Sequence, residues 1–434
     1  MRTSINLQIK NPTAFKKQLL NWSKQFREAI FLYSNNYEQK YTSYDAILAV
    51  DAFTSIKTDE INAFEDLKQY QQTTKDWLFG YLSYDYKNFV EPMLQSQHEA
   101  LSKFSLVKFV QPQTWVGLDR NGRLHGNADG LSFWEGLMRE QPSGHESPDA
   151  GVTPLPQLQW EAHTHKEDYL QHIAQIQNHI KEGDFYEMNH CIAFSAQAEI
   201  DPYQTFAALN RRAPAPFACF VKDIDQYLLC ASPERYMCLR DKVLISQPIK
   251  GTRKRQEISQ SAQTQMDVQA VLSLKNSEKD RAENIMIVDL VRNDLSRVCV
   301  PGSVHVPELC EVYTYSHVHQ MISTVVGQPK AGVGLKEIVH ATFPMGSMTG
   351  APKIAVMQHT EQLENFSRGL YSGSVGYVYQ GEMDMNVVIR SLVYDAIQQR
   401  LSYAVGGAIT VDSDAVEEYQ ECQDKAATVL SIFG

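Results

Sequence analysis

The sequence predicts a globular protein that mixes helices with strands, and three observations support this class. Apolar residues recur at the helical period through residues 278–298. Short runs rich in β-branched and aromatic residues follow one another between residues 373 and 410, as expected of strands. Hydrophobic residues make up 43% of the 434 and charged residues 21%, so the chain can bury a large core.

Charge and hydropathy exclude several classes of protein. The formal net charge of −11 disfavours binding to nucleic acid or to an anionic membrane surface. No apolar run reaches the roughly 18 residues of a membrane helix, and residues 1–26 lack the apolar core of a signal peptide. The seven cysteines include no Cys-x-x-Cys pair, which favours reduced thiols. We therefore expect a cytoplasmic protein with no nucleic-acid or membrane partner.

Residues 1–140 are expected to form a mixed half that begins with an amphipathic helix over residues 13–30. Residues 77–85 are dense in aromatic side chains and are predicted to be a core strand, in which Gly80 admits a close neighbour. Proline, glycine and serine crowd residues 141–157, where no apolar period survives, so this stretch is predicted to be a surface linker. Residues 158–434 form the second region.

The second region is predicted to alternate helices and strands. A helix over residues 165–181 is closed by Gly183, and the last helix begins at Asp412 or Ser413, which are suitable N-caps. In the helix over residues 278–298 five apolar side chains share one face: Ile285, Val288, Val291, Leu295 and Val298. The remaining elements are expected to be strands at residues 187–198, 227–230 and 243–245, a helix at residues 353–363, and strands over residues 373–410.

Lys250 lies just after a predicted strand, in the segment Gln247-Pro248-Ile249-Lys250-Gly251-Thr252. Pro248 keeps the residue before it extended, and Gly251 lets the backbone turn or approach a ligand closely. A buried lysine loses hydration, so its pKa falls and the free amine becomes a nucleophile near neutral pH. The simpler alternative is a lysine whose ammonium reaches solvent at the end of a strand.

Two predicted helices carry acid pairs of the same spacing, Asp280 with Glu283 and Glu418 with Glu421. Residues i and i+3 share a helix face. Four acids that face one another repel unless a cation lies between them, and an all-oxygen set without His or Cys points to Mg²⁺. The alternative is two solvated helix faces, on which Lys425 pairs with Glu421 at i+4.

Several other segments are candidates for binding a ligand. Residues 346–353 lack the spacing of a phosphate loop, and residues 373–376 lack the dinucleotide pattern. Gly406-Gly407-Ala408 follows an apolar strand and can present backbone N–H groups to a carboxylate. Arg390 ends a buried-looking strand and suits bidentate binding of a carboxylate. Each also has an ordinary structural alternative, as a turn or a strand end.

Seven segments occur in an order that resembles the chorismate-utilising enzymes, which include anthranilate, aminodeoxychorismate, isochorismate and salicylate synthases. The likeness is dense over residues 158–434 and weak before them, through residues 79–85. The segments are Ser232-Pro233-Glu234, Pro248-Ile249-Lys250-Gly251-Thr252, Glu283 followed by residues 288–295, Thr349-Gly350-Ala351-Pro352-Lys353, Tyr371 through Tyr377, Ile389-Arg390-Ser391, and Glu418 through Ala426.

Within this family the Pro-Ile-Lys-Gly-Thr form resembles aminodeoxychorismate synthase component I, whereas anthranilate synthases usually carry alanine at the position of Lys250. Members that use water carry a lysine where this chain has Glu187. The resemblance implies amination of chorismate at C4 to 4-amino-4-deoxychorismate, in 4-aminobenzoate and folate biosynthesis. The ammonia would come from a separate glutamine amidotransferase subunit, because no cysteine here stands in a Gly-x-Cys-x-Gly context.

The family's mechanism implies roles for these residues. Lys250 attacks C2 as the C4 hydroxyl departs, Glu234 protonates that hydroxyl, and ammonia then attacks C4 as the lysine leaves. Glu283 and Glu421 are implied as direct ligands of Mg²⁺, which would hold the ring carboxylate, with Asp280 and Glu418 reaching it through water. The substrate contacts implied in addition are Tyr371, Arg390, Gly406, Gly407, Ala408, Thr349, Gly350, Lys353 and Lys425.

Three positions depart from the family's pattern. Glu187 stands where members generally have glutamine, and Ala408 replaces a glycine of the carboxylate-binding turn. Gln320 stands where many members have a histidine that anthranilate synthases use for pyruvate loss, while His319 comes one residue early. Loss of that histidine suits an enzyme that stops before elimination, unless the register is shifted by one.

The resemblance also implies an α+β fold of two orthogonally packed antiparallel β-sheets flanked by helices, with both halves of the chain contributing to one core. Two alternative functions stay open. The first is an anthranilate synthase large component, against which Lys250 argues. The second is a chorismate-binding or partner-binding subunit without turnover, in which Lys250 could be replaced at no functional cost.

Overall fold

A computed structural model describes residues 4–9, 11–59, 63–94, 96, 98–127, 155–255, 265–315 and 318–434. The helices are α1 (Pro12–Trp22), α2 (Ala63–Thr74), α3 (Lys87–Val90), α5 (Lys166–Glu182), α6 (Pro202–Arg212), α7 (Gln265–Asn276), α8 (Glu278–Val298), α9 (Leu335–Thr342), α10 (Lys353–Leu363) and α11 (Ala415–Leu430).

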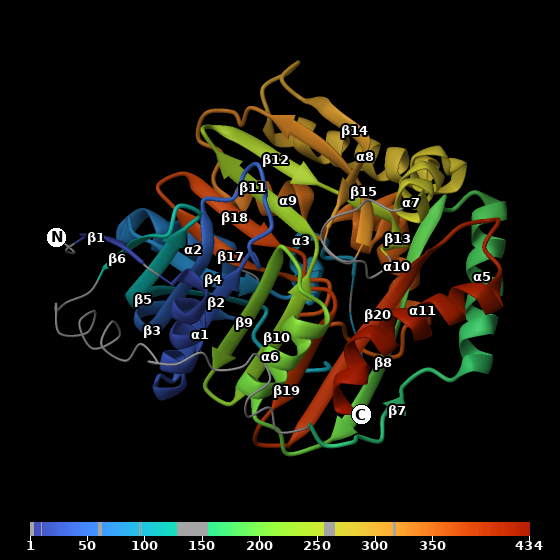
Figure 1. Ribbon diagram of the computed structural model, residues 1–434. Coiled ribbons are helices and arrows are strands. Elements are labelled where there is room, and N and C mark those ends of the chain that lie inside the picture. The colour runs from blue at the N-terminus through green and yellow to red at the C-terminus, as the bar shows by residue number, and fades with distance from the viewer. Residues whose placement is uncertain are drawn as a thin grey trace.

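The strands and helices follow one another along the chain in the order that the colours of Figure 1 trace. They are β1 (Ser4–Gln8), β2 (Glu28–Tyr33), β3 (Tyr44–Thr58), β4 (Leu78–Leu82), β5 (Val107–Asp119), β6 (Arg123–Asn127), β7 (Glu161–Ala162), β8 (Glu187–Gln197), β9 (Phe217–Asp223), β10 (Gln226–Ser232), β11 (Arg235–Arg240), β12 (Val243–Gln247), β13 (Ile249–Lys254), β14 (His305–Thr314), β15 (Val318–Gly327), β16 (Gly350–Ala351), β17 (Ser374–Tyr379), β18 (Glu382–Asn386), β19 (Ser391–Asp395) and β20 (Arg400–Ile409).

The strands form one antiparallel path through both halves of the chain. From one end, its order is β8-β20-β19-β10-β9-β2-β3-β5-β4-β17-β18-β11-β12-β15, and β13 and β14 both pair with β15. Strands of the first half therefore lie inside a sheet that the second half begins and ends.

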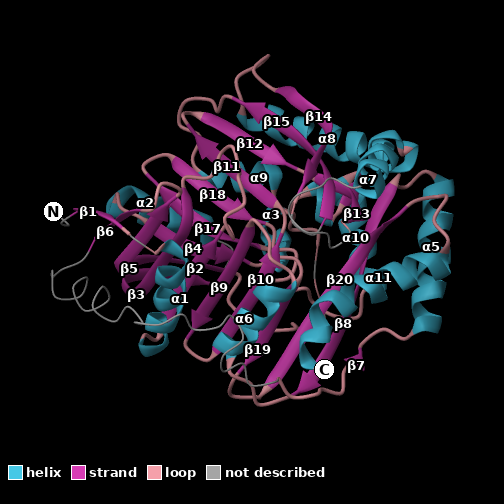
Figure 2. Ribbon diagram, in the orientation of Figure 1, coloured by secondary structure: helices cyan, strands magenta, loops and turns pink. Residues whose placement is uncertain are grey.

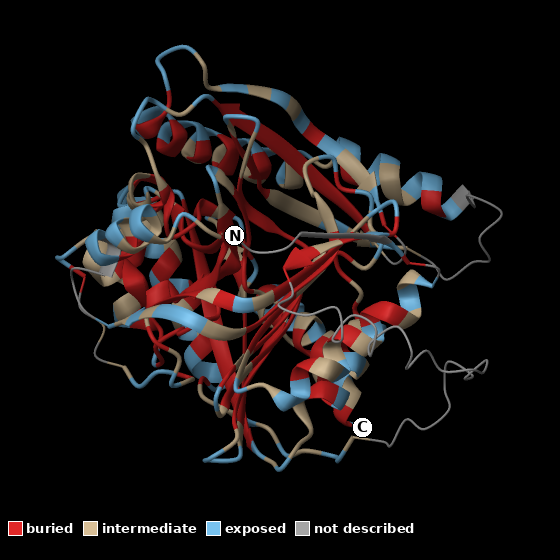
Figure 3. Cartoon of the chain, turned by 90° about the vertical axis from the view of Figure 1, so that its left-hand side faces the viewer, coloured by how far each residue is buried: buried red, intermediate tan, exposed pale blue. Residues whose placement is uncertain are grey.

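The path folds over, so that distant strands face each other across a shared core. One cluster of buried residues contains Phe79 of β4 and Val375 of β17 together with Val221 of β9 and Leu228 of β10. Figure 3 shows the buried strands running through the middle of the molecule, with the exposed residues outside them. The expected α+β class, with antiparallel strands and one core shared by both halves, is confirmed.

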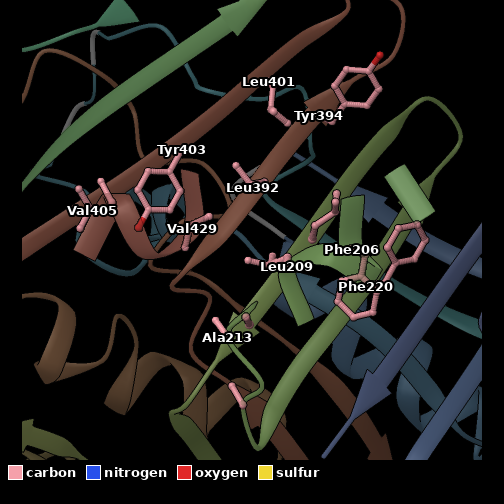
Figure 4. Packing of buried hydrophobic residues seen from close by; sticks show 14 of the residues in the cluster. Phe206, Leu209, Ala213, Phe220, Leu392, Tyr394, Leu401, Tyr403, Val405 and Val429 are labelled. Carbon is pink, nitrogen blue, oxygen red and sulfur yellow. The ribbon is translucent and has the colours of Figure 1, made fainter. Parts of the chain in front are cut away.

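Helices cover the outer faces of the sheet, as Figure 2 shows. Phe206 and Leu209 of α6 pack with Phe220 of β9, and Val429 of α11 packs in the same cluster as Tyr403 of β20 (Figure 4). Local signals set the helix ends. Asp201 caps α6 by accepting hydrogen bonds from the N–H groups of residues 203 and 204, and Pro202 takes the first helical position.

Most predicted elements lie where the sequence indicated, and the differences have local causes. The helix expected over residues 13–30 ends at Trp22, because residues 28–33, which include the β-branched Ile30 and the aromatic Phe31 and Tyr33, join the sheet as β2. The last helix is capped by Asp414, whose side chain accepts the N–H of Val416, and not by Asp412 or Ser413. In α8 the buried face carries Ile287, while Ile285 is 43% exposed.

Gly80 takes the role that the sequence predicted, since a Cβ there would lie 2.1 Å from the carbonyl oxygen of Lys108. All seven cysteines are buried and free. No helix within the described ranges has both the length and the apolar character to cross a membrane. The predicted linker lies outside the described residues except for positions 155–157, and the domain boundaries on either side of it stay predictions.

Candidate active site

Lys250 lies in β13, one strand later than the apolar run that led to it, because β12 ends at Gln247 before Pro248. Its side chain is 11% exposed, and its Nζ lies 2.7 Å from Oε1 of Glu187, the first residue of β8. Gly251 has a φ of +83°, and a Cβ there would lie 2.8 Å from Oδ1 of Asp280. The glycine thus lets α8 approach the lysine strand closely.

The charge of Lys250 differs from the sequence-based expectation. Burial lowers its pKa, as predicted, but the carboxylates of Glu187, Glu283 and Glu234 outweigh burial, and the net shift is upward. The prediction that burial leaves this amine neutral is therefore wrong for the chain without ligands. Lys250 is an ammonium here, and it must pass a proton to another group before it can attack a carbon atom.

Glu234 follows β10 and is 5% exposed. Burial raises the pKa of its carboxyl to about 7, although a hydrogen bond from Ser347 and the charge of Lys250 oppose the rise. A carboxyl group with this pKa is partly protonated at neutral pH and can donate a proton to a leaving group. The environment of Glu234 therefore fits the role of general acid that the sequence suggested.

An ion pair connects α8 and α11, the two helices that carry the acid pairs. Lys279 of α8 reaches across, and its Nζ lies 3.5 Å from Oε1 of Glu418. Burial raises the pKa of Glu283 to about 7, with like charges at Glu187 and Asp280 adding to the rise against the pull of Lys250. Of the other three acids in the two pairs, Asp280 is the one that raises the pKa of Glu283, and the facing of all four acids stays a prediction.

Observations on the four acids bear on whether they could hold Mg²⁺. Burial lowers the pKa of Lys279, but Glu418, Glu283 and Glu421 together raise it, so three of the acids act on one positive charge. The donors are all oxygens, as Mg²⁺ prefers. Within the described residues, however, no three of the acids bring oxygens within 4.8 Å of one another. The donor chemistry of the four acids suits Mg²⁺, whereas their present spacing does not form a ligand set, so the magnesium site stays a prediction.

The residues Gly406, Gly407 and Ala408 of β20 lie next to this acid cluster. They lie inside a strand rather than in the turn that was expected, since Gly406, Gly407 and Ala408 all pair with β8. Lys425 of α11 places its Nζ 3.1 Å from the carbonyl oxygen of Gly406 and 2.8 Å from Oε1 of Glu421. A Cβ on Gly407 would lie 3.4 Å from Oε2 of Glu418.

Tyr371 belongs to the same neighbourhood. Its hydroxyl lies 3.8 Å from Sγ of Cys191, and a Cβ on Gly406 would lie 2.5 Å from that sulfur. Burial raises the pKa of Tyr371 far above its usual range, so the phenol stays a neutral hydrogen-bonding group. Tyr371 and Gly406 therefore both contact the side chain of Cys191.

Arg390 provides an unused positive charge. It has a left-handed φ of +51°, and its side chain forms no hydrogen bond or ion pair with any described residue. Burial lowers the pKa of its guanidinium, while Tyr403 and Glu234 raise it, and arginine stays charged at neutral pH throughout. An arginine that is held in a strained backbone conformation near an acid, without a partner of its own, suits an anionic ligand.

In the segment that leads into α10, the side chains of Thr349 and Lys353 contact other residues of the protein, and Gly350 packs closely against β8. Thr349 donates its hydroxyl to the carbonyl oxygen of Met345 at 3.1 Å. A Cβ on Gly350 would lie 2.1 Å from the carbonyl oxygen of Glu187, so this glycine brings β16 against the start of β8. Lys353 is 2.6 Å from Oδ2 of Asp294, and this buried ion pair anchors α10. The substrate contact expected of Lys353 therefore stays a prediction.

The structure describes the surroundings of Gln320 and His319, the residues at and beside the position where the family often has a histidine. Gln320 pairs opposite Thr252 in β13, is buried, and its Oε1 has no partner within the described residues. His319 lies 2.9 Å from Oγ1 of Thr314 and 3.6 Å from Oδ1 of Asp267. His319 thus contacts Thr314 and Asp267, and the register of the family's histidine stays an open alternative.

Two residues of the site escaped the sequence reasoning. Lys279 was hidden because it stands beside Asp280 in the first turn of α8, where charged residues are common. Ser347 was hidden in a glycine-rich loop, and only the fold brings it to Glu234. The cavity lined by Tyr33, Thr42, Phe217 and Asp384 lies elsewhere, since none of the catalytic candidates lines it.

Comparison with known proteins gives a family for this arrangement. The sequence model of the chorismate binding enzymes matches residues 27–431. Aminodeoxychorismate synthase of Arabidopsis thaliana is 43% identical over 59% of this chain and 28% of that protein. Aminodeoxychorismate synthase component 1 of Klebsiella aerogenes is 41% identical over 62% of this chain and 59% of its own length. The chain thus spans less than two thirds of these relatives.

Two further matches extend over nearly the whole chain. Anthranilate synthase component 1 of Saccharolobus solfataricus is 30% identical over 95% of both chains. The crystal structure of anthranilate synthase component I from Streptococcus pneumoniae superimposes with a TM-score of 0.76, covering 91% of this chain and 93% of that one at 24% identity. At that identity the structural match shows the fold alone.

Proposed function

This chain belongs to the family of chorismate binding enzymes, and we propose on that basis that it aminates chorismate at C4 to give 4-amino-4-deoxychorismate. The observation that carries the proposal is Lys250, whose Nζ lies 2.7 Å from Oε1 of Glu187 and whose pKa is also raised by the carboxylate of Glu234. Relatives that are about 40% identical over three fifths of the chain are named aminodeoxychorismate synthases, which agrees with it.

The first step uses Lys250 and its neighbouring carboxylate. Glu187 accepts a proton from the ammonium across their 2.7 Å contact, and its Oε2 has no other partner within the described residues. The free amine then adds to C2 of chorismate, the ring double bonds shift, and the bond from C4 to its hydroxyl breaks. Glu234, with a pKa of about 7, gives its proton to the departing oxygen, which leaves as water.

The second step reverses the shift. Ammonia adds to C4, the double bonds return, and the C2–N bond to Lys250 breaks, so that chorismate and ammonia become the aminated product and water. Arg390 and the Tyr371 hydroxyl orient a carboxylate of the substrate. Glu283, Glu421, Glu418 and Asp280 would hold Mg²⁺, which supplies charge for the ring carboxylate when bound. Glu187 stands where family members generally have glutamine, and in this chain its carboxylate acts as the proton acceptor.

The ammonia is proposed to come from a partner glutaminase subunit. Hydrolysis of glutamine by a cysteine needs an accessible thiol of low pKa. All seven thiols of this chain are buried, and burial raises the pKa of Cys191, Cys219, Cys238, Cys299, Cys310 and Cys422. We expect product with ammonium, and none with glutamine unless a glutaminase subunit is added. Product from glutamine and the purified chain alone would contradict this.

The test is the identity of the product. The chain is incubated with chorismate, Mg²⁺ and ammonium, and the products are separated and identified by mass. We expect 4-amino-4-deoxychorismate, and its formation should be lost in Lys250→Ala. Turnover of chorismate that persists unchanged in Lys250→Ala would refute the covalent role, and the absence of any turnover would favour a binding subunit.

One observation favours a second candidate function. The relative that matches 95% of this chain is named anthranilate synthase component 1. That activity would release fluorescent anthranilate in the same incubation, whereas amination at C4 would not. Lys250 argues against it, because an amine that occupies C2 prevents ammonia from adding there.

A further inference from the structure

A second cluster of possible ligands lies outside the residues assigned to chorismate. It consists of His179 in the last turn of α5, Asp184 in the loop that follows, and His359 on α10. One potential ligand atom from each residue lies within 4.8 Å of the other two, and no other group of three His, Cys, Asp or Glu residues in the described part of the chain does so.

The helix end holds two of these side chains in place. Gly183 adopts a left-handed φ of +89°, and the N–H of Asp184 donates to the carbonyl oxygen of His179 at 3.0 Å. This turns the Asp184 carboxylate back onto the imidazole, where Oδ2 lies 2.8 Å from Nδ1 of His179. The pair is therefore fixed by the backbone and does not depend on a chance meeting of surface side chains.

His359 completes the cluster from the neighbouring helix. Its ring centroid lies 4.2 Å from that of His179, and its Nδ1 is buried without a hydrogen-bond partner among the described residues. A neutral imidazole can offer such an unpartnered nitrogen to a metal ion. Phe185 packs 5.1 Å away and shields the inner side of the rings.

We propose that His179, Asp184 and His359 form a binding site for a divalent transition metal ion, Zn²⁺ above all. Two imidazoles and one carboxylate are the donors that Zn²⁺ accepts, and they differ from the all-oxygen set at Glu283 and Glu421. Glu182 can supply a fourth ligand, since its Oε2 lies 3.9 Å from Nδ1 of His179.

The position of the cluster gives the ion a structural role near the active site. The N–H of Tyr186, two residues after Asp184, donates to the carbonyl oxygen of Ala351 at 2.7 Å, and Glu187 follows directly. His359 is on the helix that begins just after Ala351. An ion held by both segments fixes the loop that leads into β8 against the start of α10.

The test is a Zn²⁺ titration of the metal-free chain in competition with a chromophoric chelator. Excess Mg²⁺ is present, so that the acids of α8 and α11 do not contribute. We expect one equivalent of Zn²⁺ to bind, and His359→Gln to weaken that binding at least 10-fold. His165→Gln is the control, because His165 lies exposed at the other end of α5. It should bind Zn²⁺ as the unchanged chain does.

A second measurement separates a built site from loose surface binding. Co²⁺ in place of Zn²⁺ should give visible absorption bands typical of four-coordinate nitrogen and oxygen ligands, and these should vanish in His359→Gln and Asp184→Asn. The proposal is overturned if the chain binds no Zn²⁺ in competition with the chelator, or if His165→Gln weakens binding as much as His359→Gln. It is also overturned if the unfolding temperature of the chain does not rise with Zn²⁺.

Discussion

The ion pair between Lys250 and Glu187 should stabilise the fold as well as serve the reaction. Only 11% of the Lys250 side chain and 1% of the Glu187 side chain are exposed. Removing one member of a buried pair leaves the other charge without compensation, which costs about 3–5 kcal/mol. Glu283 and Glu234 stay near the ammonium in Glu187→Ala, so we expect the lower end of that range, about 3 kcal/mol.

A double-mutant cycle isolates this term. Lys250→Ala and Glu187→Ala should each lower the free energy of unfolding, and the double variant should lose less than their sum by about 2 kcal/mol, within the range measured for contacting residues. Urea unfolding, followed by both tryptophan fluorescence and circular dichroism, gives the free energies if the two signals coincide. Glu187→Gln is the matched control, because it keeps the shape and a hydrogen-bond acceptor.

The pair also predicts a pH dependence of stability. The pKa of Lys250 is raised in the folded chain, so its contribution is fully present below the unfolded value of about 10.4 and is lost as pH rises through the folded value. The stability difference between the unchanged chain and Lys250→Ala should therefore hold at pH 7–9 and shrink in strong alkali. Strictly additive effects, or a loss below about 1 kcal/mol in Glu187→Ala, would refute a buried pair that stabilises the fold.

The remaining predictions concern catalysis. Because the pKa of Glu234 is about 7, kcat/KM should fall as pH rises through that value, and Glu234→Gln should lose about 10²-fold or more in rate together with this alkaline limb; an unchanged profile would remove its role as acid. Lys250→Ala should fold, bind chorismate and form no mass adduct after rapid quench without ammonia, whereas the unchanged chain should form one, and Lys250→Arg should not rescue turnover. Glu421→Gln should need more Mg²⁺ for half-maximal activity with an intact circular dichroism spectrum; an unaltered Mg²⁺ titration would return Glu421 to its exposed pair with Lys425.

Sequence patterns predicted the bounds of helices and strands better than the protonation of the residues in the site. The loop over residues 346–353 predicted the start of α10, and Gly183 marked the end of α5, because each signal depends on nearby residues alone. The protonation of Lys250 could not be predicted in this way. It depends on Glu187, which is 63 residues away and reaches the lysine only through the folded sheet.

The same limit applies to two other residues. Lys353 follows a glycine-rich loop, and the sequence does not reveal that its Nζ lies 2.6 Å from Oδ2 of Asp294, 59 residues earlier. Ile285 fits the apolar period of α8, yet the face of a helix that is buried depends on what packs against it. Long-range partners therefore decide which of several equivalent sequence candidates remain free to act on a ligand.

The strand path has one more consequence. Glu187 belongs to the strand that begins the path, and Lys250 belongs to a strand at its other end. A ligand that contacts both residues therefore links the two ends of the sheet. Every strand between them, including those of the first half, must be in register before the ligand can contact both residues. Chorismate analogues should therefore raise the unfolding midpoint of the entire chain, and a cut between the two halves should abolish that protection even where both pieces remain soluble.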